Sequence, residues 1–151
     1  MRIALDTNFL VYAEGFNDVA RRDAARDIVR RLPRNDIFLP TQVLGELFNV
    51  LTRKARRRAD EVRASILAWC DTFATIETSS EVLLGAMDLA IDHRLPIWDA
   101  IIISAAAESN CRLLLSEDLH DGFIWRGVSV TNPFSANRHP LLDAVLKETK
   151  S

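Results

Sequence analysis

The stretch that decides the fold is Ile3-Ala4-Leu5-Asp6-Thr7-Asn8, in which three apolar residues are followed at once by three polar ones. This pattern predicts a short, buried strand of a parallel sheet that ends in a polar loop. The same arrangement returns near the other end of the chain, where the predicted strand 112–115, with leucine at its last three positions, leads to Asp118. Because parallel strands bring their carboxyl ends to one edge of a sheet, we expect Asp6 and Asp118 to meet there.

Strand-like and helix-like segments alternate between these two points. Further strands are predicted at 37–39, 75–78 and 128–131, and helices at 19–32, 42–57, 60–72, 80–91, 99–107 and, at the end, 141–146. Alternation of this kind favours an α/β fold with a mainly parallel central sheet. The length of 151 residues fits a single domain over 1–151, with about 135–151 as a C-terminal tail or helix.

The composition is that of an ordinary globular protein, with 48% hydrophobic and 26% charged residues and a formal charge of −2. This charge argues against a protein that coats nucleic acid by bulk positive charge, although basic residues crowd 21–34 and 53–63. Cys70 and Cys111 lack the spacing of a zinc or redox motif and are expected to be buried thiols. With no basic-then-apolar leader and no long apolar run, we expect a cytoplasmic protein.

Two further acidic residues are directed to the same edge of the predicted sheet. Glu46 lies in an early turn of the helix 42–57, on the same side as Gln42, and Asp99 lies where the helix 99–107 begins. Each acid alone has an ordinary explanation, which is a turn for Asp6, solvent for Glu46, an N-cap for Asp99 and a polar loop for Asp118. Together they predict an anionic cluster at the carboxyl ends of the strands.

Such a cluster requires positive charge, because two like charges about 4 Å apart repel by roughly 4 kcal/mol at an effective dielectric near 20. The available ligands are oxygens, which favours Mg²⁺ or Mn²⁺ over zinc and points to metal-assisted phosphate chemistry. Thr7, Asn8, Ser104 and Asn132 could orient ligands or waters, although turns and caps explain them equally well. Catalytic triads, glycine-rich phosphate loops and aspartyl-phosphate chemistry each lack required residues, and the last would need a second aspartate where Asn8 stands.

At this point the chain resembles the PIN-domain ribonucleases, and among them the VapC toxins of bacterial toxin–antitoxin pairs. The resemblance is carried by Ile3 to Asn8, by Leu44-Gly45-Glu46-Leu47, by Trp98-Asp99-Ala100, by Leu115-Ser116-Glu117-Asp118-Leu119 and by the closing stretch from Gly127 to Phe134. It implies a three-layer α/β/α sandwich and an endoribonuclease that depends on Mg²⁺ or Mn²⁺. It also implies homodimers and inhibition by a small cognate antitoxin.

On this basis Asp6, Glu46, Asp99 and Asp118 are expected to be both metal-binding and catalytic, and a metal-activated water is expected to cleave RNA. Arg53, two turns beyond Glu46 on the same helix face, is the expected contact for the RNA backbone. Two alternatives remain open from the sequence. One is a PIN nuclease of housekeeping RNA processing, and the other is a non-catalytic α/β interaction module.

Overall fold

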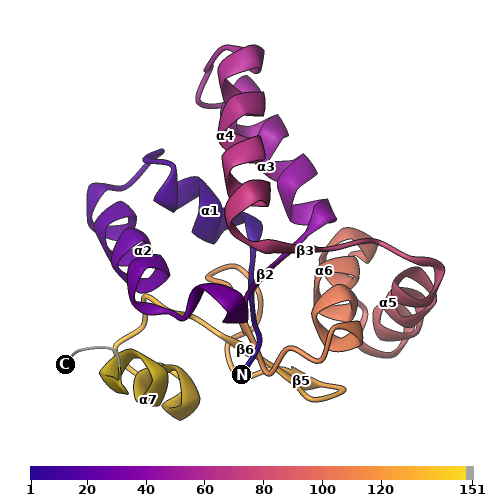
Figure 1. Cartoon of the computed structure of the whole chain (residues 1–151). Coiled ribbons are helices and arrows are strands. Elements are labelled where there is room, and N and C mark those ends of the chain that lie inside the picture. The colour runs from indigo at the N-terminus through magenta and orange to yellow at the C-terminus, as the bar shows by residue number, and fades with distance from the viewer. Residues whose placement is uncertain (149–151) are drawn as a thin grey trace.

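The computed structural model describes residues 1–148 and contains a six-stranded sheet with the strand order β3-β2-β1-β4-β6-β5 (Figure 1). All neighbouring strands are parallel except β5 and β6, which are antiparallel. The strands are β1 (Ile3–Leu5), β2 (Ile37–Pro40), β3 (Ala74–Ile76), β4 (Leu113–Leu115), β5 (Ile124–Trp125) and β6 (Val128–Thr131). The predicted α/β fold with a mainly parallel sheet is therefore confirmed.

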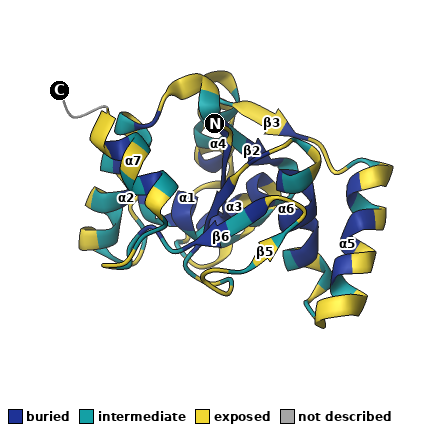
Figure 2. Cartoon of the chain, turned by 90° about the horizontal axis from the view of Figure 1, so that it is seen from below, coloured by how far each residue is buried: buried dark blue, intermediate teal, exposed yellow. Residues whose placement is uncertain are grey.

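Seven α-helices flank the sheet within the described residues. They are α1 (Thr7–Ala13), α2 (Val19–Arg31), α3 (Thr41–Arg53), α4 (Ala59–Thr72), α5 (Ser80–His93), α6 (Ile97–Glu108) and α7 (Pro140–Glu148), with a 3-10 turn η1 at Arg34–Asp36. In Figures 1 and 2, α2 and α7 lie on one side of the molecule and α5 and α6 on the other. The last three residues of the predicted C-terminal tail lie outside the described residues.

The central strands are short and fully buried because helices cover both of their surfaces. Every residue of β1 and β4 is buried, and dark blue fills the centre of Figure 2. Strands buried on both faces read as continuous apolar runs, which is why Ile3–Leu5 and Leu113–Leu115 were recognisable in the sequence. Leu5 pairs with Leu115 at the last register position, so the residues that follow these two strands are direct neighbours.

The first helix, α1, was not predicted, because residues 6–8 were expected to continue as a loop. Asp6 is instead the N-cap of α1, and its carboxylate accepts a hydrogen bond of 2.7 Å from the backbone N–H of Thr7. Phe9, Leu10 and Val11 are all buried, so this seven-residue helix shows no amphipathic spacing. The polar residues after β1 therefore start a helix directly.

Several element boundaries differ from the prediction. Helix α3 ends at Arg53 and not at residue 57, because the N–H groups of Ala55 and Arg57 turn back to the carbonyls of Val50 and Leu51. Helix α6 begins at Ile97 after Pro96, which places Asp99 in its first turn and not at its cap. The short strand β5 was missed in the sequence; a tight turn with positive φ at Arg126 and Gly127 joins it to β6.

The two cysteines differ in burial. Cys111 is buried, and burial raises the pKa of its thiol to about 12, whereas Cys70 is only half-buried. The expectation of two buried thiols is thus correct for Cys111 alone. Within residues 1–148, none of the helices has the length and apolar character needed to cross a membrane.

The strand order places a crevice at β1 and β4. From β1 the chain moves outward through β2 and β3 in one direction, and β4, β6 and β5 lie in the other. In open α/β sheets, ligands bind at this switch point, outside the carboxyl ends of the strands. Asp6 follows β1 and Ser116 follows β4, so both residues lie at the switch point.

Candidate functional site

The four acidic residues that the sequence analysis singled out line one open pocket of about 570 Å³ at the carboxyl ends of the strands. Asp6 follows β1, Glu46 lies in α3, Asp99 lies in the first turn of α6, and Asp118 follows β4. The remaining polar lining is neutral and comes from Thr7, Asn8, Thr41, Gln42, Asn49 and Thr78. No lysine, arginine or histidine of residues 1–148 lines this pocket.

Asp6 is the most deeply buried of the four acids, with only 6% of its surface exposed. One carboxylate oxygen accepts the Thr7 N–H at 2.7 Å, and the other accepts the Ser116 hydroxyl at 2.6 Å. Burial, together with the smaller effect of the charges of Glu46 and Asp118, raises the pKa of Asp6 to about 6 against the opposing effect of the two hydrogen bonds. The carboxylate of Asp6 is therefore held in a fixed orientation, and burial makes its charged form less stable than it would be in water.

Glu46 is fixed from both of its oxygens. Gln42, one turn earlier on α3, donates an amide hydrogen bond of 3.0 Å to one oxygen, and the Thr7 hydroxyl donates one of 2.5 Å to the other. The hydrogen bond from Thr7 joins the first turn of α1 to α3. Thr7 thus touches one acid through its backbone and a second acid through its side chain.

Asp118 and Asp99 are less buried but are also strained electrostatically. The Asn8 side-chain amide donates a hydrogen bond to Asp118, and burial together with the neighbouring Glu117 raises the pKa of Asp118. Burial raises the pKa of Asp99 as well, and the charges of Glu46 and Asp118 add to the shift. Asp99 and Asp6 thus feel the charges of the same two carboxylates, Glu46 and Asp118.

A second polar cluster anchors the turn that carries Asp118. Glu117 accepts hydrogen bonds from the Tyr12 hydroxyl at 2.8 Å and from Arg21 at 2.5 Å, and Arg21 lies over the rings of Tyr12 and Phe134. Glu117 is thereby turned away from the pocket, toward α1 and α2. The sequence analysis did not single out this cluster, because its members are far apart in the chain.

Of the four residues predicted to orient ligands or waters, Thr7 and Asn8 line the pocket, whereas Ser104 and Asn132 do not. Thr7 and Asn8 contact the acids, but Ser104 is buried on α6 and donates its hydroxyl to the carbonyl of Val82 on α5 at 2.7 Å. A Cβ atom at Gly85 would lie 2.7 Å from the Ser104 hydroxyl oxygen, so Ser104 belongs to the close packing of α5 on α6. Asn132 accepts the Phe134 N–H in a turn after β6.

Arg53 is exposed at the end of α3 and does not line the pocket. Gln42 and Asn49, which share the helix face of Glu46, do line it. Ser116 was not proposed as a site residue, although its position after β4 corresponds to that of Asp6 after β1. The parallel register was the signal that could have identified it.

The donor set suits a hard divalent cation. All of the groups that converge on the pocket are carboxylate, amide or hydroxyl oxygens and amide nitrogens, and carboxylate oxygens are the ligands that Mg²⁺ and Mn²⁺ prefer. Within residues 1–148, no group of three or more acidic, histidine or cysteine side chains is arranged to hold one ion directly. Mg²⁺ usually keeps several waters and binds through one or two carboxylates, which is compatible with this arrangement.

Comparison with known proteins agrees with the fold. The PIN domain family model matches residues 3–120, and the chain therefore belongs to the PIN domain family. Its structural neighbours are VapC toxins of VapBC toxin–antitoxin systems. A comparison with curated proteins found no match.

Three solved structures illustrate the likeness. VapC20 of Mycobacterium tuberculosis, a toxin that cleaves the sarcin–ricin loop, is 20% identical over 77% of this chain and 91% of its own, with a TM-score of 0.65. A toxin–antitoxin complex from Klebsiella pneumoniae is 18% identical over 87% and 98%, with a TM-score of 0.66. FitAcB of Neisseria gonorrhoeae is 17% identical over 87% and 98%, with a TM-score of 0.63. At these identities the likeness establishes a shared fold.

Proposed function

We propose that this protein is a divalent-metal-dependent endoribonuclease and the toxin of a type II toxin–antitoxin pair. The observation that carries the proposal is the convergence of Asp6, Glu46, Asp99 and Asp118 on one pocket that no basic side chain of residues 1–148 lines. The PIN fold and its likeness to VapC toxins support the same reaction class. PIN nucleases are generally metal-dependent, and Mg²⁺ or Mn²⁺ is the proposed cofactor.

The four carboxylates would hold one or two ions, directly or through waters. When bound, such an ion supplies positive charge to the phosphate oxygens and makes a nearby water a stronger nucleophile. Asp6 is fixed by Thr7 and Ser116, and Glu46 is fixed by Gln42 and Thr7, so these two carboxylates are oriented before any ligand arrives. Asp118, oriented by Asn8, and Asp99 complete the cluster from the other strands and helices.

The neutral polar residues at the rim of the pocket would contact the RNA substrate. Thr41, Asn49 and Thr78 offer hydroxyl and amide groups at its lining and can hydrogen-bond the sugar and phosphate of a strand that enters it. Because amides and hydroxyls do not repel phosphate, the substrate approaches from this rim and not across the carboxylates. Cleavage is expected to leave 5′-phosphate and 3′-hydroxyl ends.

Incubation of the purified chain with mixed cellular RNA in Mg²⁺ or Mn²⁺ tests the reaction. We expect endonucleolytic fragments with these ends, none in excess chelator, and at least a 100-fold loss with Asp99→Asn. Asp92→Asn, an exposed aspartate on α5, is the matched control and should cut at the wild-type rate. Equal cutting by the Asp99→Asn and Asp92→Asn chains would contradict the proposed site.

The partners are proposed from the relatives, some of which crystallised as toxin–antitoxin complexes. We propose a small antitoxin that binds and inhibits this chain, and a homodimeric form of it. Co-expression with the product of the adjacent small reading frame should relieve growth arrest and yield a stable complex. Cleavage without any growth arrest would favour a housekeeping nuclease, and no cleavage of any RNA would favour a non-catalytic module.

A further inference from the structure

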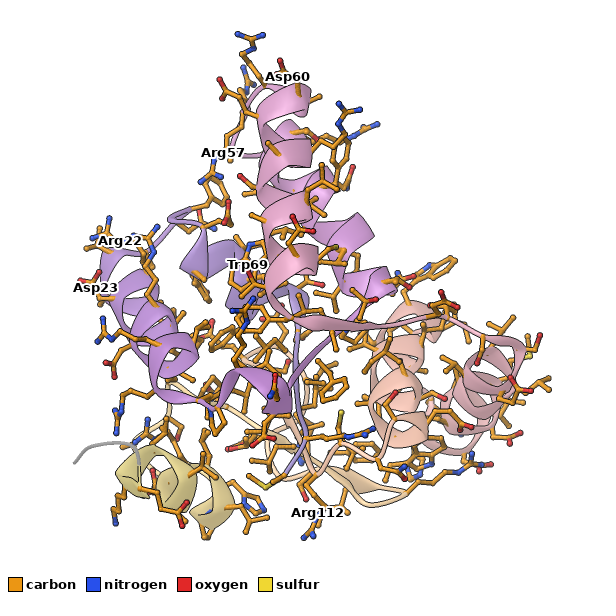
Figure 3. All side chains as sticks on the ribbon, in the orientation of Figure 1. Arg22, Asp23, Arg57, Asp60, Trp69 and Arg112 are labelled. Carbon is orange, nitrogen blue, oxygen red and sulfur yellow. The ribbon has the colours of Figure 1, made fainter. Side chains whose placement is uncertain are left out.

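The hairpin of α3 and α4 projects away from the rest of the molecule (Figure 1). Helix α3 begins beside the pocket, where Gln42 and Glu46 line the wall, and ends at Arg53. Helix α4 begins at Ala59 and returns to the body, and Asp60 marks the far end of the hairpin in Figure 3. The two helices therefore connect the acidic pocket to a distant tip, which we define as residues 53–63.

The hairpin tip is rich in basic residues, with six arginines and lysines against two acids, Asp60 and Glu61. Two of its arginines are engaged within the protein. Arg57 pairs with Glu14 at 2.9 Å, and Arg58 pairs with Asp60 at 3.0 Å across a largely exposed surface. The tip nevertheless retains a clear excess of positive charge.

The other four basic side chains of the tip are Arg53, Lys54, Arg56 and Arg63. All four are exposed, and within residues 1–148 none of them has an ion-pair, hydrogen-bond or aromatic partner. The arginines of α2 differ, since Arg21 is bound by Glu117 and Arg31 by Asp27. Positive charge on α2 thus stabilises the fold, whereas positive charge at the tip is left for an external ligand.

The tip is held in a fixed position relative to the body. Glu14, the C-cap of α1, accepts hydrogen bonds from Arg57 and, at 3.1 Å, from the indole N–H of Trp69 on α4. Figure 3 shows Arg57 at the hairpin loop and Trp69 lower on α4. Val62 is fully buried and ties the start of α4 to α3. A braced surface loses little conformational freedom when a ligand binds.

We propose that the hairpin tip binds the phosphate backbone of the RNA strand whose cleavage site lies in the acidic pocket. This inference rests on the proposed nuclease function, and it answers a problem that the pocket poses. No basic side chain of residues 1–148 lines the pocket, so the pocket side chains cannot by themselves attract a polyanion. Arginine and lysine contacts to phosphate supply affinity and position without reading sequence, which is what a distant basic tip can provide.

The geometry of α3 sets the length of RNA involved. At 1.5 Å per residue, Arg53, the last residue of α3, lies about 10 Å along the helix from Glu46, and Lys54 and Arg56 follow in the loop after the helix. With a phosphate every ~3.4 Å along a duplex strand, this span corresponds to at least about three nucleotides. A strand must therefore extend beyond the cleavage site on the side of α3 to reach the tip.

The test measures RNA binding by the full chain carrying Asp99→Asn, which prevents cutting during the titration. The probe is a fluorescent 20-nucleotide single-stranded RNA, titrated over a range of salt concentrations. With Lys54→Gln, Arg56→Gln and Arg63→Gln combined, we expect at least tenfold weaker binding at 0.1 M salt. The slope of log affinity against log salt should fall by about 2, since each lost phosphate contact to a single strand removes roughly 0.7.

The matched control removes the same number of charges elsewhere. Arg94→Gln, Arg112→Gln and Lys147→Gln change three exposed basic residues whose side chains also lack ion-pair and hydrogen-bond partners in the described part of the chain. Arg112 lies at the opposite end of the molecule from the tip in Figure 3. The control is expected to weaken RNA binding by no more than twofold, and thermal unfolding of both combinations should match that of the parent.

The possible outcomes distinguish a failure of the proposed RNA binding by the tip from a failure of the proposed nuclease activity. Equal losses in the two combinations would show an effect of net charge alone and overturn the proposal. Unchanged RNA binding with weaker binding of a polyglutamate probe would assign the tip to an acidic protein partner and overturn it as well. If the wild-type chain cuts RNA while the tip substitutions change neither affinity nor salt slope, the tip fails and the nuclease stands. If no RNA is cut but the tip substitutions still weaken RNA binding, the nuclease proposal fails and RNA binding by the tip stands.

Discussion

The hydroxyl of Ser116 donates a hydrogen bond of 2.6 Å to the carboxylate of Asp6, although 110 residues separate them in the chain. This contact follows from the strand register. Because Leu5 pairs with Leu115, the residues that follow them, Asp6 and Ser116, are neighbours. The Ser116 hydroxyl oxygen also accepts the Leu119 N–H at 3.1 Å, which closes the turn that carries Asp118. One buried hydroxyl thus connects two of the four acids.

Removal of this hydroxyl is expected to damage both stability and activity. Ser116→Ala leaves one oxygen of a buried carboxylate and the N–H of Leu119 without their partner, which should cost roughly 1–3 kcal/mol of unfolding free energy. Cleavage should fall about tenfold, because Asp6 and the Asp118 turn lose a common support. Urea unfolding and initial cleavage rates measure the two effects. Ser80→Ala, at an exposed position on α5, should change neither, and a Ser116→Ala chain as active and stable as wild type would refute the role.

Replacement of Asp6 by asparagine is expected to stabilise the metal-free protein at neutral pH. Because the folded pKa of Asp6 is about 6, above its unfolded value of 3.8, ionisation of this group opposes folding. This cost is absent below about pH 4, grows between pH 4 and 6, and is complete above that. Asparagine can still accept the Thr7 N–H, and its amide can donate to the Ser116 hydroxyl oxygen.

The measurement for Asp6→Asn is chemical unfolding in excess chelator at pH 4 and pH 7.5. We expect a gain of roughly 1–3 kcal/mol at pH 7.5 and little or none at pH 4, since two pKa units correspond to about 3 kcal/mol. Cleavage should be lost in the same variant. Asp92→Asn serves as the control on an exposed site, and a stability gain that is equal at both pH values would show that the charge of Asp6 is not its source.

The sequence was sufficient to predict five of the six strands and the convergence of the four acids, because both depend on local patterns. Apolar runs followed by Asp6 and Asp118 mark strand ends, and parallel strands leave little choice about where those ends lie. Helix α1 escaped prediction because all of its apolar positions are buried and its length is only seven residues. A helix of that length carries too few residues for the 3.6 period to stand out.

The supporting contacts could not be predicted from sequence, since they depend on distances between side chains from separate elements. Glu117 looks like any exposed acid beside Asp118, yet it is held by Tyr12 and Arg21 from two helices. Ser104 was expected to be a site residue because it lies on the same helix as Asp99. Its hydroxyl lies instead on the side of that helix that packs against α5, close to Gly85. Sequence spacing shows which residues share a face of a helix. Only the structure shows whether that face meets the pocket or a neighbouring helix.

The contacts that Glu14 makes with the α3–α4 hairpin should stabilise the protein far more than the exposed ion pair of Arg58 with Asp60. Arg57 and Glu14 are partly buried, with 31% and 17% of their side chains exposed, and Glu14 also accepts the Trp69 N–H. Arg57→Gln is expected to cost roughly 1.5–3 kcal/mol, since it removes charge-assisted hydrogen bonds from a partly buried carboxylate. Arg58→Gln is the matched change at an exposed pair, 74% and 63% exposed, and should cost less than about 1 kcal/mol. Urea midpoints compare the two variants, and equal midpoints would show that Glu14 does not brace the hairpin.

Divalent cations should stabilise the folded chain, and more strongly at pH 7.5 than at pH 5. A ligand at 100 times its dissociation constant contributes about 2.7 kcal/mol, which for a domain of this size raises Tm by roughly 5–10 °C. Metal must compete with protons for carboxyl groups whose pKa values are raised, and that of Asp6 is about 6, so protonation at pH 5 weakens binding. Thermal scans with and without Mn²⁺ at the two pH values test this. The shift should persist in Asp92→Asn and disappear when Asp99→Asn and Asp118→Asn are combined. A shift of the same size in the combined variant would mean that Mn²⁺ binds elsewhere on the molecule.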